Sequence, residues 1–344
     1  MSVNFIFFTV FNIFCLNICV KSEAKLRPIY NSGHDVLFVA RCEAKCWRSQ
    51  NKGCLRECLL RPYIKPGLCP QNTTILSPFA RVCLELCHAD SHCPRLEKCC
   101  AHHCGITCQE PDQLSSAVGV PGIPREIIIT ELRKRAVHIQ WTKKSHYNLN
   151  NSSTVIFLIE ERHHPGKHYT EAKLTKWTPF LTTDKTECFL KKAIKPGNWY
   201  QFKIAAVNEN GTKGYSKTSY PFSTSVSPKP PKKPLDIAVS RLYKTKNGSI
   251  NAELKWKEPP SDLPVQKYKL FWSIRLHGIK ALDSVFVRHQ FVSKEQKTFL
   301  LKNLSANSEY FLQLQAISQF GKQRLKSDKS NLLLNTTLYK KGVP

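Results

Sequence analysis

Cysteine is the residue type whose spacing carries the strongest chemical signal in this chain. Twelve of the 15 cysteines lie between Cys42 and Cys108. The first four form two pairs, Cys42-x3-Cys46 and Cys54-x3-Cys58, and residues four apart lie on one face of a helix. The pattern predicts two short helices joined by the disulfides Cys42–Cys58 and Cys46–Cys54, with a tetrahedral zinc site as the alternative.

The first residues bear on that choice because they indicate the compartment. Residues 5–20 are apolar and uncharged, which is typical of a secretory signal peptide at 1–22. The run is shorter than the ~20 residues of a spanning helix, so an uncleaved anchor is the weaker interpretation. Export favours disulfides over zinc. Six candidate glycosylation sites agree with export: Asn72, Asn151, Asn210, Asn247, Asn303 and Asn335.

A second cysteine group follows the lead-in Lys65-Pro-Gly-Leu-Cys69-Pro and ends at Cys108. Eight cysteines in so short a segment leave no room for a hydrophobic core, so covalent bridges must hold it. The adjacent pair in Lys98-Cys-Cys, the preceding Asp90 and the closing x3, x3 spacing resemble the whey acidic protein (WAP) four-disulfide core. The resemblance implies the pairs Cys69–Cys100, Cys83–Cys104, Cys87–Cys99 and Cys93–Cys108.

Many WAP domains inhibit serine proteases through an extended loop around the second cysteine. Here the first interval, Pro70 to Val82, is long, whereas the second, Leu84 to Leu86, is shorter than in the inhibitors. A glycan on Asn72 would occupy the same loop. We therefore expect a structural or interaction role for this module, with inhibition of serine proteases as the alternative.

The back half of the chain alternates apolar and polar residues with period two, which predicts strands with one buried face. Val137, Ile139 and Trp141 begin one such pattern, and Ala252, Leu254 and Trp256 begin a second copy. The separation of the copies predicts a duplicated domain of about 100 residues.

Each copy carries a tyrosine, Tyr200 or Tyr310, within an alternating apolar strand. A tyrosine at this place is a hallmark of immunoglobulin-like sandwiches, and both copies resemble fibronectin type III domains. If Phe189 and Ile194 face the core, Cys188 faces solvent as an odd thiol. The fold class is then mainly β and multidomain: a signal peptide 1–22, a cysteine-rich segment 23–66, a WAP core 67–112, and fibronectin type III repeats 121–226 and 233–338.

This order of modules, with Ala40-Arg-Cys42, the segment 199–208 and Gly321-Lys-Gln-Arg-Leu-Lys-Ser327, resembles the anosmin family. Vertebrate members have four repeats and a longer cysteine-rich segment, so an invertebrate or truncated form would fit. The resemblance implies a secreted matrix and cell-surface glycoprotein that binds heparan sulfate proteoglycans and promotes adhesion. It also implies guidance of neuronal migration and axon growth, partly through fibroblast growth factor receptor signalling.

Charge separates the two halves of the chain. Residues 121–344 hold 39 Lys and Arg against 16 Asp and Glu, a net charge of +23. Such a surface binds dense polyanions, and export leaves sulfated glycosaminoglycans and anionic membrane surfaces as partners rather than nucleic acid. The candidate heparan sulfate residues are Arg133, Lys134, Arg135, Lys191, Lys192, Lys255, Lys257, Lys322, Arg324 and Lys326.

An enzyme is disfavoured by the types and spacing of the polar residues. The histidine pairs His102-His103 and His163-His164 belong to no recognisable set of nucleophile, base and orienting group. We expect no catalytic residue, no cofactor and no metal ion.

Overall fold

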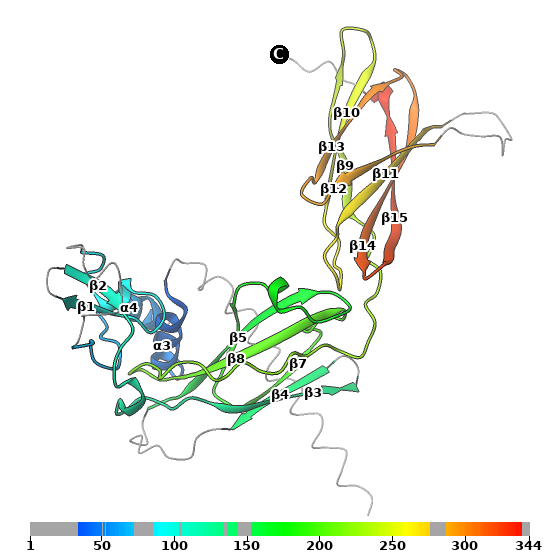
Figure 1. Ribbon diagram of the computed structural model, residues 1–344. Helices are drawn as coiled ribbons and strands as arrows, with labels where there is room; N and C mark the ends of the chain where they lie inside the picture. Colours follow the sequence, from blue (N-terminus) through cyan, green and yellow to red (C-terminus); the bar gives the residue numbers. More distant parts are fainter. Residues whose placement is uncertain are drawn as a thin grey trace, which may run out of the picture. The chain divides into compact units, whose positions relative to one another are not determined.

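A computed structural model describes residues 34–49, 51, 53–71, 85–102, 105–133, 136–142, 153–275 and 287–338 (Figure 1). The chain forms two compact units. The first contains the residues up to 164 with 170–194 and 200–222, and the second contains 165–169, 195–199 and the residues from 223 onward. None of the helices in the described ranges is long and apolar enough to cross a membrane.

The described part of the first unit begins with two short helices, α3 (Val36–Cys46) and α4 (Cys54–Leu60). Asp35 caps α3, because its Oδ1 accepts the backbone N–H of Leu37 at 2.9 Å. Disulfides Cys42–Cys58 and Cys46–Cys54 join the helices. Two i, i+4 pairs therefore face each other across the turn.

The disulfide module that follows has little regular structure. It contains a 3-10 turn at Asp90–His92 and an antiparallel hairpin of β1 (Lys98–His102) and β2 (Gly105–Gln109). Three disulfides hold the described part: Cys69–Cys100, Cys87–Cys99 and Cys93–Cys108. The remaining predicted pair, Cys83–Cys104, lies outside the described residues.

The first repeat is a β-sandwich of two three-stranded sheets with the orders β3-β4-β7 and β6-β5-β8. Residues 215 and 222 add isolated bridges to β8. Two 3-10 turns, Leu114–Ser116 and Glu171–Lys173, lie outside the sheets. The strands are β3 (Arg125–Leu132), β4 (Ala136–Thr142), β5 (Ile156–Pro165), β6 (Thr178–Thr183), β7 (Glu187–Lys191) and β8 (Asn198–Val207).

The second repeat is also a sandwich of two sheets, and one of these has a fourth strand (Figure 1). Its sheets have the orders β13-β10-β9 and β12-β11-β14-β15, and a 3-10 turn at Thr336–Leu338 follows the last strand. The strands are β9 (Leu235–Lys244), β10 (Ile250–Lys257), β11 (Lys267–Ile274), β12 (Arg288–Ser293), β13 (Thr298–Leu304), β14 (Glu309–Phe320) and β15 (Gln323–Asn335).

The same aromatic pair anchors both cores. Trp141 meets Phe157 edge to face at 5.3 Å between ring centroids, and Trp256 meets Tyr268 in the same way at 5.4 Å. Both tryptophans are buried. This equivalence relates strands β4 and β5 of the first repeat to β10 and β11 of the second.

The predicted orientation of Cys188 is wrong. Cys188 is buried in the first core opposite Ile139, whereas Phe189 faces outward and stacks on His138 with 4.3 Å between ring centroids. Strand β7 ends at Lys191, and Lys192 has a positive φ of 64°. The prediction failed because it placed Phe189 on the core face. The buried residues of β7 are Cys188 and Leu190, and Ile194 beyond the strand is buried as well.

The tyrosine of the second repeat fixes the turn before its own strand, because the Tyr310 hydroxyl accepts the backbone N–H of Ser305 at 2.8 Å. Tyr310→Phe leaves that N–H without this partner and should destabilise the second repeat by roughly 1–3 kcal/mol. Hydrogen exchange of the β14 amides in the full chain measures the loss. Tyr243→Phe, at a 41% exposed position, is the matched control, and equal protection in both variants would refute the prediction.

Burial of Cys188 leads to a prediction about its reactivity. The native, non-reduced protein should not react with a thiol reagent at Cys188, because burial shields the sulfur. In denaturant without reductant, one label should appear at this residue. Mass spectrometry of the labelled peptides distinguishes the two states, and rapid labelling of the native protein would show that the core opens at β7.

Candidate functional site

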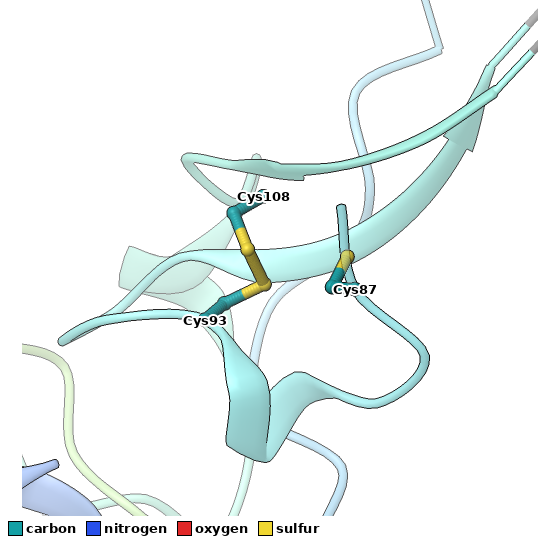
Figure 2. A group of neighbouring side chains, drawn as sticks. All are labelled: Cys87, Cys93 and Cys108. Carbon is teal, nitrogen blue, oxygen red and sulfur yellow. A yellow bond between two sulfur atoms is a disulfide. The ribbon is translucent and has the colours of Figure 1, made fainter. Parts of the chain in front are cut away.

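The described cysteines are structural rather than metal-binding. The sulfur atoms of Cys87, Cys93 and Cys108 lie within 4.8 Å of one another, but Figure 2 shows the Cys93–Cys108 bond, and Cys87 is bonded to Cys99. A cysteine that binds a metal ion does so as a thiolate, which a disulfide sulfur is not. The two helical pairs are disulfides as well, so the zinc alternative for Cys42–Cys58 does not fit this structure.

The charged residues of the WAP-like motif form a buried network in place of an apolar core. The Lys98 Nζ lies 2.8 Å from the Asp90 Oδ2, with side chains only 8% and 9% exposed. Asp90 also accepts the backbone N–H groups of Lys65 and Cys99, both at 2.7 Å. The Lys65 ammonium donates to the carbonyls of Cys93 and Glu97. One carboxylate thus ties the lead-in segment to the β1 strand.

Burial and hydrogen bonding act in opposite directions on these groups. Burial favours the neutral acid at Asp90, but the hydrogen bonds from Lys98, Cys99 and Lys65 outweigh it and lower the pKa of Asp90. Burial lowers the pKa of the Lys65 ammonium despite the nearby carboxylates of Asp35 and Asp90. The ionised form of Asp90 is therefore part of the folded module.

Helix α3 packs on the outer face of the β6-β5-β8 sheet. Leu37, Ala40 and Ala44 of the helix are each at most 5% exposed. The sheet supplies Ile156 and Leu158 from β5 and Ala205 and Val207 from β8. The capping residue adds a second link, because the Asp35 Oδ2 accepts the backbone N–H of Arg95 at 2.8 Å. The cysteine-rich segment, the disulfide module and the first sandwich thus share one body.

The same strands, β5 and β8, also carry a buried ion pair. The Lys203 Nζ lies 2.8 Å from the Glu160 Oε2, and the ammonium sits 3.9 Å from the ring centroid of Tyr215 and 4.7 Å from that of Trp177. The Tyr215 hydroxyl donates to the Glu160 Oε1 at 3.0 Å. Burial lowers the pKa of Lys203, and burial with the adjacent Glu160 raises that of Tyr215. Helix and ion pair leave little of this sheet face for a ligand.

The predicted basic residues of the first repeat are only partly described. Arg133, Lys191 and Lys192 are exposed, and Lys191 pairs with Ala136 at the start of β4. Lys134 and Arg135 lie outside the described residues.

The predicted basic residues of the second repeat lie on two different sheets. Lys255 and Lys257 are exposed on β10, and Asp236 holds Lys257 in an ion pair of 2.8 Å. The hydrogen bond to Asp236 raises the pKa of Lys257. Lys322, Arg324 and Lys326 are exposed in or beside β15. The five residues therefore form two separate clusters.

Three further lysines of the second repeat were not among the predicted basic residues. Lys267 and Lys269 alternate outward along β11, and Lys329 reaches the same face from β15. All three ammonium groups lie over phenylalanine rings. The period-two pattern Lys267-x-Lys269-x-Phe271 was visible in the sequence, but the rings that it meets belong partly to another strand.

The candidate glycosylation sites differ in their surroundings. Asn72 and Asn151 lie outside the described residues, and so does most of the interval Pro70 to Val82 that would form a protease-binding loop. The Asn210 amide donates to the carbonyl of Gly119 at 3.2 Å, so a glycan there would replace this link. Asn247 and Asn303 are exposed in the second repeat, whereas Asn335 is half-buried.

The disulfide module matches a known protein family, and most of the chain is similar to known proteins. Residues 65–111 match the family of the WAP-type (Whey Acidic Protein) 'four-disulfide core'. Anosmin-1 of Coturnix japonica is 34% identical over 305 residues, which is 86% of this chain and 44% of that protein. Anosmin-1 of Homo sapiens is 33% identical over 321 residues, or 91% of this chain and 46% of the relative. The chain fits the anosmin family.

The anosmin relationship extends beyond the WAP core into both sandwiches, which are fibronectin type III-like. The chain spans slightly less than half the length of the anosmin-1 proteins that it matches. A more distant relative is the neural cell adhesion molecule L1-like protein of Mus musculus, 23% identical over 211 residues, which is 60% of this chain and 15% of that protein.

The buried carboxylate of the WAP core yields a prediction about pH. Because the folded pKa of Asp90 lies below the unfolded value of about 3.9, ionised Asp90 stabilises the module above that pH, and the stabilisation is lost as the pH falls through the folded pKa. Asp90→Asn leaves the Lys98 charge buried without its partner and should cost roughly 3–5 kcal/mol at neutral pH.

Hydrogen exchange of the β1 and β2 amides in the full chain, followed from pH 7 downward, tests this prediction. Glu110→Gln, at an exposed position of the same module, is the control and should behave as the natural protein does. Protection of β1 and β2 should depend less on pH in Asp90→Asn. Equal protection in both variants at neutral pH would contradict the assigned role of Asp90.

Proposed function

We propose that this chain is a secreted adhesion glycoprotein that binds heparan sulfate through its fibronectin type III-like repeats. Homology to anosmin-1 and the more distant likeness to a neural cell adhesion molecule support the adhesion role. Five disulfides in the described residues support export, because such bridges persist in oxidising compartments. The signal peptide at 1–22 remains a prediction and lies outside the described residues.

The observation that carries the heparan sulfate proposal is the charge at the β14–β15 hairpin. Lys322, Arg324 and Lys326 are exposed and recur at period two, and none of them forms an ion pair with another described residue. Cations on an exposed strand that are not neutralised by carboxylates attract a sulfated chain and release its counterions on binding. The cluster that includes Lys257 should attract a sulfated chain less strongly, since Asp236 already neutralises part of its charge.

The wider proposal follows the anosmin relatives. Heparan sulfate proteoglycans would hold the protein at the cell surface and in the matrix by peripheral association. There it would influence neuronal migration, axon growth and growth factor receptor signalling, with the fibroblast growth factor receptor as the candidate receptor. No residue in the described ranges favours the alternative, inhibition of a serine protease, over this role.

The basic hairpin gives a salt-dependent prediction. Replacing Lys322, Arg324 and Lys326 together with Gln should lower the salt concentration at which the full chain elutes from heparin. It should also reduce the slope of log affinity against log salt by up to roughly 0.9 per cation, the value for nucleic-acid phosphates. Isothermal titration with a heparin oligosaccharide at several salt concentrations measures the slope.

Matched variants show whether position or total charge matters. Replacing Lys229, Lys232 and Lys233, which lie between strands β8 and β9, with Gln removes the same charge from another exposed place. Lys255→Gln with Lys257→Gln tests the β10 cluster, and Lys191→Gln with Lys192→Gln tests the first repeat. If the hairpin variant and the variant at Lys229, Lys232 and Lys233 elute together, the charge acts without a defined site, and if the natural chain is not retained on heparin the proposal fails.

A further inference from the structure

The outer face of the β12-β11-β14-β15 sheet carries an ordered set of lysines and aromatic rings, here called the lysine–aromatic face. It consists of Lys267, Lys269 and Phe271 of β11, Phe291 of β12 and Lys329 of β15. The strand register places Lys269 directly opposite Phe291 on one side and Gln315 on the other, and Gln315 is opposite Lys329. These side chains therefore form continuous rows across four strands.

Cation–π contacts arrange the lysines over the rings. The Lys267 Nζ lies 4.5 Å from the ring centroid of Phe291, and the Lys269 Nζ lies 4.8 Å from that of Phe271. The Lys329 Nζ lies 4.3 Å from the Phe271 centroid and donates to the Gln313 Oε1. Each ammonium is held in place by a ring and yet is on the outer side of the sheet.

The face exposes more apolar surface than the outer side of an antiparallel sheet usually does. Phe291 is 47% exposed, and Phe311 and Leu333, which pair across β14 and β15, are 40% and 47% exposed. Contiguous exposed apolar side chains bordered by polar ones are typical of an interaction site. A polysaccharide offers no apolar side chain to cover Phe311 and Leu333, whereas a protein segment does.

The exposed apolar residues call for apolar side chains on the partner, and the charge of the face calls for acidic ones. Lys267, Lys269 and Lys329 are positive, and no described residue at the paired outward positions between Phe311 and Gln315 is acidic. The acids that border the face are Glu309, paired with Arg275 at 3.2 Å, and Asp328, in the bulge of β15. Glu295 lies at another border, where it accepts the hydroxyl of Ser293 opposite Lys267. An incoming segment with carboxylates beside its apolar side chains would complement these lysines.

The first repeat shows within the same chain what can cover this face. The aromatic core pairs align Ile156 and Leu158 of β5 with Lys267 and Lys269 of β11. In the first repeat these positions are apolar and lie under helix α3. The equivalent face of the second repeat has lysines at the same places, so a helix that docks there must bring negative charge.

We infer that the lysine–aromatic face binds an amphipathic helix of a protein partner whose apolar side chains are flanked by Asp or Glu. Apolar residues at i, i+3 or i+4, and i+7 would cover Phe291, Phe311 and Leu333. The flanking carboxylates would meet Lys267, Lys269 and Lys329. None of its residues belongs to the Lys322–Lys326 cluster, although Lys326 lies in the same cross-strand row as Lys267, with Ile317 between them. The inference does not rest on heparan sulfate binding.

A displayed library of random 16-residue peptides tests the inference on the full chain. Peptides are selected on the natural protein and depleted on Lys269→Glu/Phe291→Thr, in which both changes lie at the surface. The enriched peptides should combine Asp or Glu with apolar residues at helical spacing. A synthetic peptide from this set should bind at least tenfold more weakly to the depleting variant.

Reversal of charge on both the protein and the peptide distinguishes loss of the site from misfolding of the variant. Lys269→Glu/Lys329→Glu should lose the acidic peptide and gain the same peptide with its acids changed to Lys, which a misfolded variant would not do. The double Gln variant at Lys322 and Arg324, which keeps Lys326 in the row of Lys267, should bind the acidic peptide within about twofold of the natural protein, whatever its retention on heparin.

Three results would overturn the inference. One is enrichment of acidic peptides without apolar residues, because it would indicate an unspecific ionic surface. Another is loss of heparin retention in Phe291→Thr together with displacement of the peptide by a heparin oligosaccharide, which would assign the face to polyanion binding. The third is an absence of peptides that distinguish the natural chain from Lys269→Glu/Phe291→Thr.

Discussion

A β-sandwich buries one face of each sheet, and this constraint separates what is fixed in the two repeats from what varies. The inner positions repeat closely, since Trp141 over Phe157 has its counterpart in Trp256 over Tyr268. The outer positions are free of this packing requirement. In the first repeat they are used to dock helix α3 and to bury the Lys203–Glu160 pair, and in the second they carry exposed lysines and rings. The functional differences between the repeats thus arise from residues that the fold does not specify.

The disulfide module follows a different constraint, because it is too small to build an apolar core. Its disulfides limit the unfolded chain, and the Asp90 carboxylate organises the interior by accepting the Lys98 ammonium and two backbone N–H groups. A buried ion pair adds little stability when compared with apolar packing, but removal of one partner is costly. The charged residues of the motif therefore act as positioning groups, which explains why Lys65 and Lys98 can be buried in a module whose described residues form no hydrophobic cluster of their own.

The sequence predicted the features that depend on local pattern. Cysteine spacing gave the helix pair around Cys42 and Cys58, and alternation gave the strands that contain Trp141 and Trp256. Features that depend on tertiary contacts could not be predicted. Helix α3 has an ordinary apolar stripe, and its sequence does not indicate that it packs on β5 and β8. The error at Cys188 came from assigning Phe189 to the core, whereas Phe189 stacks on His138 and the neighbouring Cys188 and Leu190 are the buried residues of β7. The basic clusters were located in sequence, but the sequence did not reveal that Lys257 and Lys326 belong to different sheets.

The charged residues of the sandwiches lie at the outer positions, which the core does not constrain. Edge strands need features that keep the sheet from pairing with other chains, and lysine serves this purpose there. A basic protein surface can arise for this reason alone, without any ligand. The arrangement on β11 and β15 differs from such a surface, because its lysines lie over exposed rings and its carboxylates lie at the borders. Solubility requires charge but not exposed phenylalanine, so the combination of both on one face is better explained by binding than by protection of the sheet.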